Sequence, residues 1–262
     1  MKKLILTLFA SAALVSCSTN SSSDNSSSGG LLLKSVNDGS SSGVITFNYN
    51  GNKLINATDS TGDIFTMTYS GDLIIKQENS PSSPHHYINT YNYINNLLVS
   101  STNNYSTSSS LSNFTYNPDG SITENMTYTD LSQNFTFNDM TKRYYSQGNC
   151  IKKEEYSDVN NVMTLNSTTT YTYDANNSPF KNITGFSAWQ NASGTSVKNN
   201  ETGAITKNSS GVITRISQTI YQYNSQNYPI SGIETSTPYT TNSFTGTIPG
   251  TPTITTSLLT YY

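Results

Sequence analysis

The stretch Thr46–Ile55, TFNYNGNKLI, recurs in altered form at Thr66–Ile75, TMTYSGDLII. In both copies polar and apolar residues alternate up to a tyrosine, which is the period-two pattern of a strand with one buried face. A glycine preceded by a small polar residue comes next, and such a pair favours the tight turn of a β-hairpin. Apolar residues then begin a second strand. Each copy therefore predicts one β-hairpin.

Looser copies of this unit continue along the chain. The aromatic residues at the repeated position are 20 to 24 residues apart at first: Tyr49, Tyr69, Tyr93, Tyr116 and Phe137, followed at wider spacing by Tyr173 and Tyr223. A lone hairpin is only marginally stable, so the units are expected to share one sheet. We predict an all-β fold, an antiparallel meander of repeated β-hairpins of about 20–24 residues that forms an open or curled sheet.

The composition supports strands and excludes several classes of protein. Charged residues make up only 11% of the 262, and the 13 Lys and Arg form no basic cluster, which argues against nucleic-acid binding. The hydrophobic content is only 33% with the 19 tyrosines included, so a core needs the apolar area of their rings. Tyrosines two apart share a strand face, as in Tyr91/Tyr93, Tyr171/Tyr173 and Tyr221/Tyr223. We expect those rings in the core, the alternative being an exposed ladder that stacks on a ligand.

The N-terminus has the features of an export signal. Two lysines precede the apolar run Leu4–Val15, which is too short to span a bilayer. The run ends in Leu14-Val15-Ser16-Cys17, which resembles the bacterial lipobox and implies diacylglyceryl attachment to the Cys17 thiol. We therefore predict a lipoprotein signal peptide at 1–16, a lipidated Cys and Ser/Asn/Gly-rich tether at 17–30, and a β-repeat domain at 31–262. This places the chain in the bacterial envelope, anchored by lipid in the outer membrane.

Two segments carry a resemblance to known proteins. Tyr171–Ile183 and Tyr221–Ile230 are similar to segments of uncharacterised Bacteroidetes-type lipoproteins, and their Tyr-x-Tyr-Asp/Asn pattern resembles the tyrosine-aspartate (Rhs-type) repeat. The resemblance implies a β-rich envelope protein and brings no catalytic residues. The segment Ile254–Tyr262 is expected to close the sheet as its last strand. Because the exposed strand positions are Thr, Asn and Ser, we expect a domain that does not face lipid.

Residues with catalytic or metal-binding chemistry are few. His85 and His86 are expected in a loop. No spaced His/Cys/Asp cluster supplies the further ligands that a metal site would need, so no metal or other cofactor is predicted. Cys150 is expected half-buried on a strand. Asn117–Gly120 reads as a turn, because a calcium loop needs more ligands.

Two carboxylate pairs are the candidates for acid/base chemistry. Glu154 and Glu155 are adjacent and would face opposite sides of a strand, while Asp59 and Asp63 flank a turn glycine. Neither pair is expected to form a concave catalytic site.

We therefore expect a membrane-tethered, non-enzymatic envelope or cell-surface interaction protein. Its expected partners are the membrane, through lipid on Cys17, and a polysaccharide or an envelope protein. One alternative is a glycan-binding accessory lipoprotein that uses exposed tyrosines and Trp189, the single tryptophan, as ligand contacts. The second alternative is a carboxylate-dependent hydrolase, which would need two convergent acidic groups in one pocket.

Overall fold

The computed structural model describes residues 30–39, 43–80, 86–194, 197–242 and 246–262. These residues form seventeen strands and one helix. In chain order they are β1 Leu33–Asn37, β2 Val44–Asn50, β3 Lys53–Thr58, β4 Ile64–Ser70, β5 Leu73–Asn79, β6 Tyr87–Ile94, β7 Leu97–Tyr105, β8 Ser108–Tyr116, β9 Ile122–Asp130, β10 Phe135–Ser146, β11 Asn149–Val159, β12 Val162–Tyr173, α1 Phe186–Ser193, β13 Glu201–Asn208, β14 Ile213–Tyr223, β15 Pro229–Asn242, β16 Gly246–Pro249 and β17 Thr253–Tyr261.

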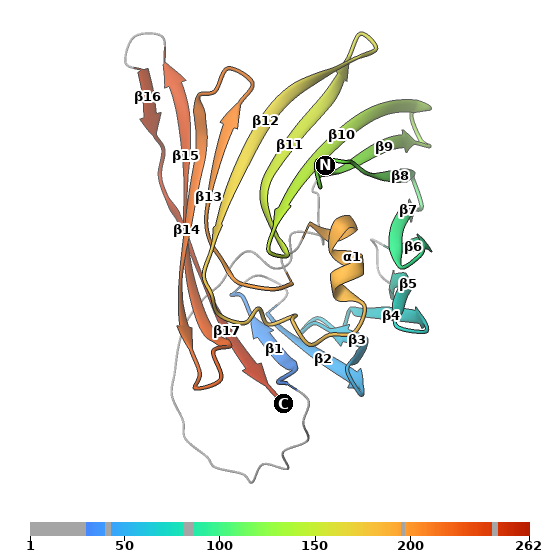
Figure 1. The fold of residues 1–262 in the computed structure, drawn as a ribbon, viewed down its shortest axis with the longest axis vertical. Helices are drawn as coiled ribbons and strands as arrows, with labels where there is room; N and C mark the ends of the chain where they lie inside the picture. The colour runs from blue at the N-terminus through green and yellow to red at the C-terminus, as the bar shows by residue number, and fades with distance from the viewer. Residues whose placement is uncertain (1–29, 40–42, 81–85, 195–196, 243–245) are drawn as a thin grey trace.

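The sheet closes on itself. Successive strands from β1 to β15 pair antiparallel, β15 pairs with β17, and β17 pairs with β1. Fifteen strands and β17 thus form a ring of sixteen, while β16 continues along the far end of β15. The predicted antiparallel hairpins and the predicted final strand are present, but the predicted open or curled sheet is wrong: the fold is a closed β-barrel (Figure 1).

The repeated unit explains the closure. In β2 and β3 the pairing register shifts just before Tyr49, which then lies opposite Leu54. The same bulge precedes other aromatic residues at the repeated position, which we call the anchor residues. A bulge increases local twist and bends the strand, so its repetition curls the sheet. One further unit is split between the chain ends, because Tyr261 lies opposite Leu33. No local pattern reveals such a unit, since its two halves are more than 220 residues apart.

One anchor residue differs from the sequence prediction. Tyr145 lies after a register shift and opposite Cys150, in the position that Tyr49 occupies in its own hairpin. Phe137, the predicted anchor, instead lies near the start of β10 and stacks on Tyr128 of β9, with ring centroids 4.8 Å apart. The predicted spacing fails here because β10 has twelve residues, compared with seven in β2 and β4.

The strand lengths make the barrel uneven. Strands β1 to β6 have five to eight residues, whereas β10, β11, β12, β14 and β15 have eleven to fourteen. The long strands stand as a tall wall on one side of Figure 1, and the short ones form the low side. We call the end that holds the Asn-Gly-type turns the plugged end and the opposite end the tall end.

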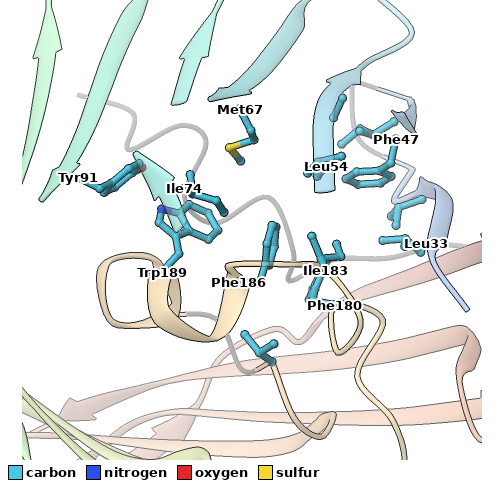
Figure 2. Packing of buried hydrophobic residues seen from close by; sticks show 14 of the residues in the cluster. Leu33, Phe47, Leu54, Met67, Ile74, Tyr91, Phe180, Ile183, Phe186 and Trp189 are labelled. Atoms are coloured by element: carbon cyan, nitrogen blue, oxygen red, sulfur yellow. The ribbon is translucent and has the colours of Figure 1, made fainter. Parts of the chain in front are cut away.

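The connection between β12 and β13 enters the barrel at the plugged end. Its helix α1 begins after Gly185, which has φ 83°, and ends at Gly194, which also has left-handed backbone. Figure 2 shows aromatic and aliphatic side chains of this segment facing the barrel wall. The buried cluster joins wall residues to plug residues: Leu33, Ile45, Phe47, Leu54, Met67, Ile74, Tyr91, Leu98, Phe114 and Ile122 from strands, and Phe180, Ile183, Phe186, Trp189 and Val197 from the plug. The hydrophobic core is therefore the inside of the barrel.

The outside of the barrel is polar along most of its circumference. On β4 the inward Phe65, Met67 and Tyr69 alternate with the exposed Thr66 and Thr68. The register carries this pattern around the wall through the outward residues Asn48, Asn56, Lys76, Thr90, Asn92, Ser100, Thr102, Asn113, Thr115, Thr127, Lys142, Glu154 and Thr170. This is the reverse of a lipid-facing barrel, in which the outward residues form an apolar band.

Candidate functional site: the barrel lumen

The anchor tyrosines form a ring of internal fastenings at the plugged end. Their hydroxyls donate to backbone carbonyls of neighbouring hairpins: Tyr49 to Leu33 at 2.8 Å, Tyr116 to Leu98 at 3.2 Å, Tyr173 to Cys150 at 2.8 Å and Tyr261 to Pro229 at 2.8 Å. Six of the rings pack against the core, those of Tyr49, Tyr69, Tyr93, Tyr116, Tyr145 and Tyr261. Burial raises the pKa of several of these phenols, that of Tyr69 to about 12. The tyrosine repeat thus has a structural explanation, and its rings face inward.

The plug is held by backbone and side-chain bonds to the turns around it. The Thr184 N–H donates to the Asn52 carbonyl at 2.9 Å, and the Tyr69 hydroxyl donates to the Thr184 carbonyl at 3.3 Å. At its other end, the Asn200 side chain donates to the Asp174 carboxylate, which also accepts from Tyr223. The segment therefore occupies the lumen at this end as a fixed part of the fold.

Above the plug, the inner surface of the long strands is polar. Arg143 and Glu124 form a buried ion pair with an Nη1–Oε2 distance of 2.8 Å, and Ser112 donates to the same carboxylate at 2.6 Å. Arg143 is only 8% exposed. A buried charge of this kind is retained only when paired, because its desolvation is costly.

Closer to the tall end, solvent reaches the inward-facing charges. Lys153 pairs with Glu155 at 2.9 Å, and Ser167 donates to Glu155 at 2.9 Å. The Glu155 side chain is 45% exposed although its register position points into the barrel, opposite the inward Ser167. The lumen is therefore open to water at this level.

Two further glutamates, Glu201 and Glu234, have inward positions in the barrel, and the charge of Glu234 acts on Glu201. Burial raises the pKa of Glu201 to about 7, the negative charge of Glu234 adds to that increase, and Lys153 opposes it. Burial likewise raises the pKa of Glu234. The inward Tyr171 and Tyr221 belong to the same surroundings, because the charge of Glu201 contributes to the raised pKa of both phenols. The site combines carboxylates, a lysine and aromatic rings, next to the partly exposed Glu155.

None of these lumen residues forms a sequence motif. Glu201 is the first residue of β13, and Glu234 lies within β15. Their inward positions come together only because both strands pair with β14. The predicted carboxylate pairs do not converge. Glu154 faces outward and binds Lys152 at 2.9 Å, whereas Glu155 faces the lumen, as adjacent strand residues must.

The remaining predicted residues have mostly structural surroundings. Asp59 accepts from the backbone N–H groups of Thr61 and Asp63 within the β3–β4 turn. In the turn Asn117–Gly120, Asp119 accepts from Ser121, which confirms a turn. Among the described residues no group of three or more His, Cys, Asp and Glu could hold a metal ion.

Trp189 and Cys150 are both buried. Trp189 is 5% exposed and packs edge-on against Tyr91, so the expectation of an exposed indole is wrong. Its position on the inward face of α1 explains the burial, and a ligand contact there stays a prediction. Cys150 is 6% exposed, and burial raises the pKa of its thiol. Cys17 and His85 lie outside the described residues, and the His86 Nδ1 lies 3.0 Å from the Asn79 carbonyl oxygen.

A separate hollow lies at the outer side of the plug. It has a volume of about 660 Å³ and lies between the β4–β5 and β6–β7 turns and the start of α1, where Asp72, Asn96, Leu97 and Ser187 line it. Its lining offers one carboxylate, one tyrosine, two leucines and several small residues. This mixed polar and apolar lining gives an open depression rather than a site with convergent reactive groups.

Comparison with known proteins finds similar solved structures but no matching family. No protein-family model and no curated protein matches the chain. A porin-like protein from Bacteroides vulgatus is similar with a TM-score of 0.59 and 14% identity, over 89% of this chain and 99% of that one. A porin-like protein from Bacteroides uniformis gives a TM-score of 0.49 and 13% identity, over 88% and 95%. The likeness to the first structure shows the fold and agrees with the closed ring.

No helix among the residues that the structure describes is long and apolar enough to cross a bilayer.

Proposed function

We propose that the chain is a non-enzymatic, lipid-tethered protein of the bacterial envelope, anchored at the outer membrane. In this proposal the barrel stands in water and presents the open tall end of its lumen to a ligand or partner. The polar outer wall of β2 to β12 is the observation that carries the proposal. A barrel that crosses a bilayer would place its outward Thr, Asn, Lys and Glu side chains in hydrocarbon, at a cost of several kcal/mol for central charges.

The interior supports binding rather than conduction. The plug fills the lumen at one end with aromatic and aliphatic side chains, while the tall end keeps partly exposed charges and tyrosines. A conduit needs a continuous polar path, whereas a binding site needs a hollow that is closed behind the ligand. The similarity to the porin-like structure from Bacteroides vulgatus concerns only the fold, that is, the closed ring of strands.

The anchor in this proposal is Cys17. The lipobox-like Leu14–Cys17 supports lipidation, and several acyl chains on one residue give durable membrane attachment. The polar tract that follows has nothing to bury and suits a tether. Labelling with radioactive palmitate in the native host tests the anchor, with Cys17→Ala as the control: label that persists in the variant would exclude this anchor.

The side of the membrane decides between two kinds of partner. Intact and permeabilised cells are digested with proteinase K and blotted for the chain, with Cys17→Ala in parallel. Degradation in intact cells places the barrel on the surface and favours capture of glycans or adhesion partners. Protection until permeabilisation places it in the periplasm and favours a partner in envelope assembly.

Glycan binding is the second candidate, and the lumen favours it over the plug. Tyr171 and Tyr221 are half-buried on inward positions near Glu201, and aromatic faces with carboxylates are the groups that sugars stack on and bind. Pull-down on insoluble peptidoglycan and soluble α- and β-glucans tests it, with Tyr171→Ala as the variant and Tyr128→Ala as the matched control. Saturable binding that only the first change abolishes supports this candidate; binding equal in both variants excludes the lumen as the site.

The hydrolase alternative is tested with the same polysaccharides. Glu201 and Glu234 are the convergent carboxylates that it would require. Release of reducing ends that is lost in Glu201→Gln and Glu234→Gln would overturn the non-enzymatic proposal. We expect no release above the level of a heat-denatured sample.

A further inference from the structure

One part of the outer wall departs from the polar pattern. On strands β13, β14, β15 and β17 the outward positions carry exposed isoleucines: Ile205 at 39% exposure, Ile220 at 74%, Ile233 at 40% and Ile254 at 67%. We call these four residues, together with the outward Ile216 and Leu258, the isoleucine patch. Exposed apolar residues are common singly, but a contiguous group marks an interaction surface.

The register shows that the patch is contiguous. Ile205 lies directly opposite Ile216, and Ile220 lies directly opposite Ile233. Ile254 lies opposite Thr235, two positions from Ile233 on the same face. The patch therefore crosses four neighbouring strands rather than following one.

On β14, β15 and β17 the patch carries no charge, while the exposed Lys207 stands two residues from Ile205 at its β13 edge. Between the isoleucines, the outward residues of β14, β15 and β17 are Gln218, Gln222, Ser231, Thr235, Thr237 and Thr256. The outward face of β10 and β11, by contrast, carries Lys142, Lys152 and Glu154. Covering the patch on these three strands thus desolvates amide and hydroxyl groups but no ion, and the long Lys207 side chain can keep its ammonium group in water at the edge.

The place where the tether joins the barrel indicates what covers the patch. The chain enters the barrel at Leu33 of β1, and β1 pairs with β17, the edge strand of the patch. The fourteen residues from Cys17 to Gly30 reach roughly 20 Å as a flexible chain. The patch therefore lies on the side of the barrel nearest the anchor, and the tether itself is too polar to cover it.

We propose that the isoleucine patch rests on the lipid bilayer, so that the tethered barrel lies on its β13–β17 side. The proposal rests on the lipid anchor of the proposed function, which keeps the domain at high effective concentration near lipid. A patch of this size alone gives weak binding, and the tether makes weak binding sufficient. Since the apolar surface covers only one side of the ring, the barrel lies on the membrane rather than through it.

The test uses fluorescent labels on the purified, lipidated full chain. Ile233→Cys places a thiol in the patch, and Leu111→Cys is the matched control, because Leu111 is an outward residue of similar exposure (45%) that stands among polar neighbours on β8. Cys17 is blocked by its lipid and Cys150 is buried, so each variant has one reactive thiol. Both are labelled with NBD and bound to vesicles of phosphatidylethanolamine and phosphatidylglycerol with nitroxides on the acyl chains.

The expected result is quenching of the Ile233 label several-fold stronger than that of the Leu111 label. Equal quenching of the two labels, in protein that floats with the vesicles, overturns the patch proposal and leaves the tether intact. Shielding of the Ile233 label in detergent-free solution without vesicles also overturns it, because a second copy or a protein would then cover the patch. Protein that fails to float with the vesicles overturns the lipid anchor and, with it, this placement.

Discussion

The substitution Glu201→Gln removes a carboxyl group whose ionisation the barrel opposes. Burial, with the nearby charge of Glu234, raises the pKa of Glu201 from 4.5 to about 7. Each pKa unit corresponds to about 1.4 kcal/mol, so holding this group as a carboxylate in the folded chain costs about 3 kcal/mol. Glutamine keeps the shape of the protonated group and carries no charge at any pH.

The sign follows from proton binding. Between pH 4.5 and pH 7 the unfolded chain has released the Glu201 proton while the folded chain still holds it, so folding stability falls as pH rises through this window. Above pH 7 both forms are ionised and the loss is complete. The wild-type chain should therefore lose about 3 kcal/mol relative to Glu201→Gln between pH 4.5 and pH 8, with the two nearly equal at pH 4.5.

Urea unfolding at pH 4.5, 6 and 8 measures this difference. Glu78→Gln is the control, because Glu78 is an outward residue that pairs with Lys76 on the polar wall. We expect Glu201→Gln to raise the free energy of unfolding at pH 8 and to leave it almost unchanged at pH 4.5, while the control shows no such pH-dependent gain. Parallel curves for wild type and Glu201→Gln across this range would refute the assignment of Glu201 to a desolvating, negatively charged environment.

The plug and the tyrosine ring make further predictions, each read by urea or thermal unfolding. Trp189→Ala should cost about 3–5 kcal/mol because it empties a buried aromatic position; a loss below 1 kcal/mol would contradict the packing of the plug. Gly185→Ala should be more damaging than Gly211→Ala, since both glycines have positive φ but only at position 185 would a Cβ come within 2.7 Å of the Asp72 carbonyl; equal losses would contradict this contact. Tyr116→Phe should lower the free energy of unfolding by about 1 kcal/mol, the value of one hydroxyl hydrogen bond; an unchanged stability would contradict a stabilising role for the bond to the Leu98 carbonyl.

Much of the fold could be predicted from local pattern. Alternation up to Tyr49 and Tyr69 with glycine turns correctly predicts antiparallel hairpins, because strand period and turn chemistry are local properties. The inward position of Tyr91 follows from the scarcity of aliphatic residues, and burial confirms it. Closure could not be predicted in the same way, since it depends on β1 meeting β17 from the far end of the chain.

The candidate site was less accessible to sequence reasoning. Trp189 looked exposed because it lies outside the repeats, whereas the connection that carries it folds back into the barrel and uses the indole as core. Glu201 and Glu234 gave no signal because their proximity depends on the registers of three strands. The polar outer wall was foreseen from composition, and only the registers reveal that the isoleucines gather on one side.

The central claim of the proposed function is that no strand of the barrel crosses the bilayer and that the N-terminal lipid is what keeps the chain at the membrane. The most direct test is to export the chain from Ser18 onward behind a cleavable signal peptide that lacks a lipobox, with the native chain in parallel, and to extract the membranes with sodium carbonate. We predict that the chain without the anchor is recovered as a folded, detergent-free protein in the soluble fraction, while the native chain stays with the membranes. A chain without the anchor that remains in the carbonate-washed membranes would show that the strands themselves are embedded in lipid, and would contradict the account.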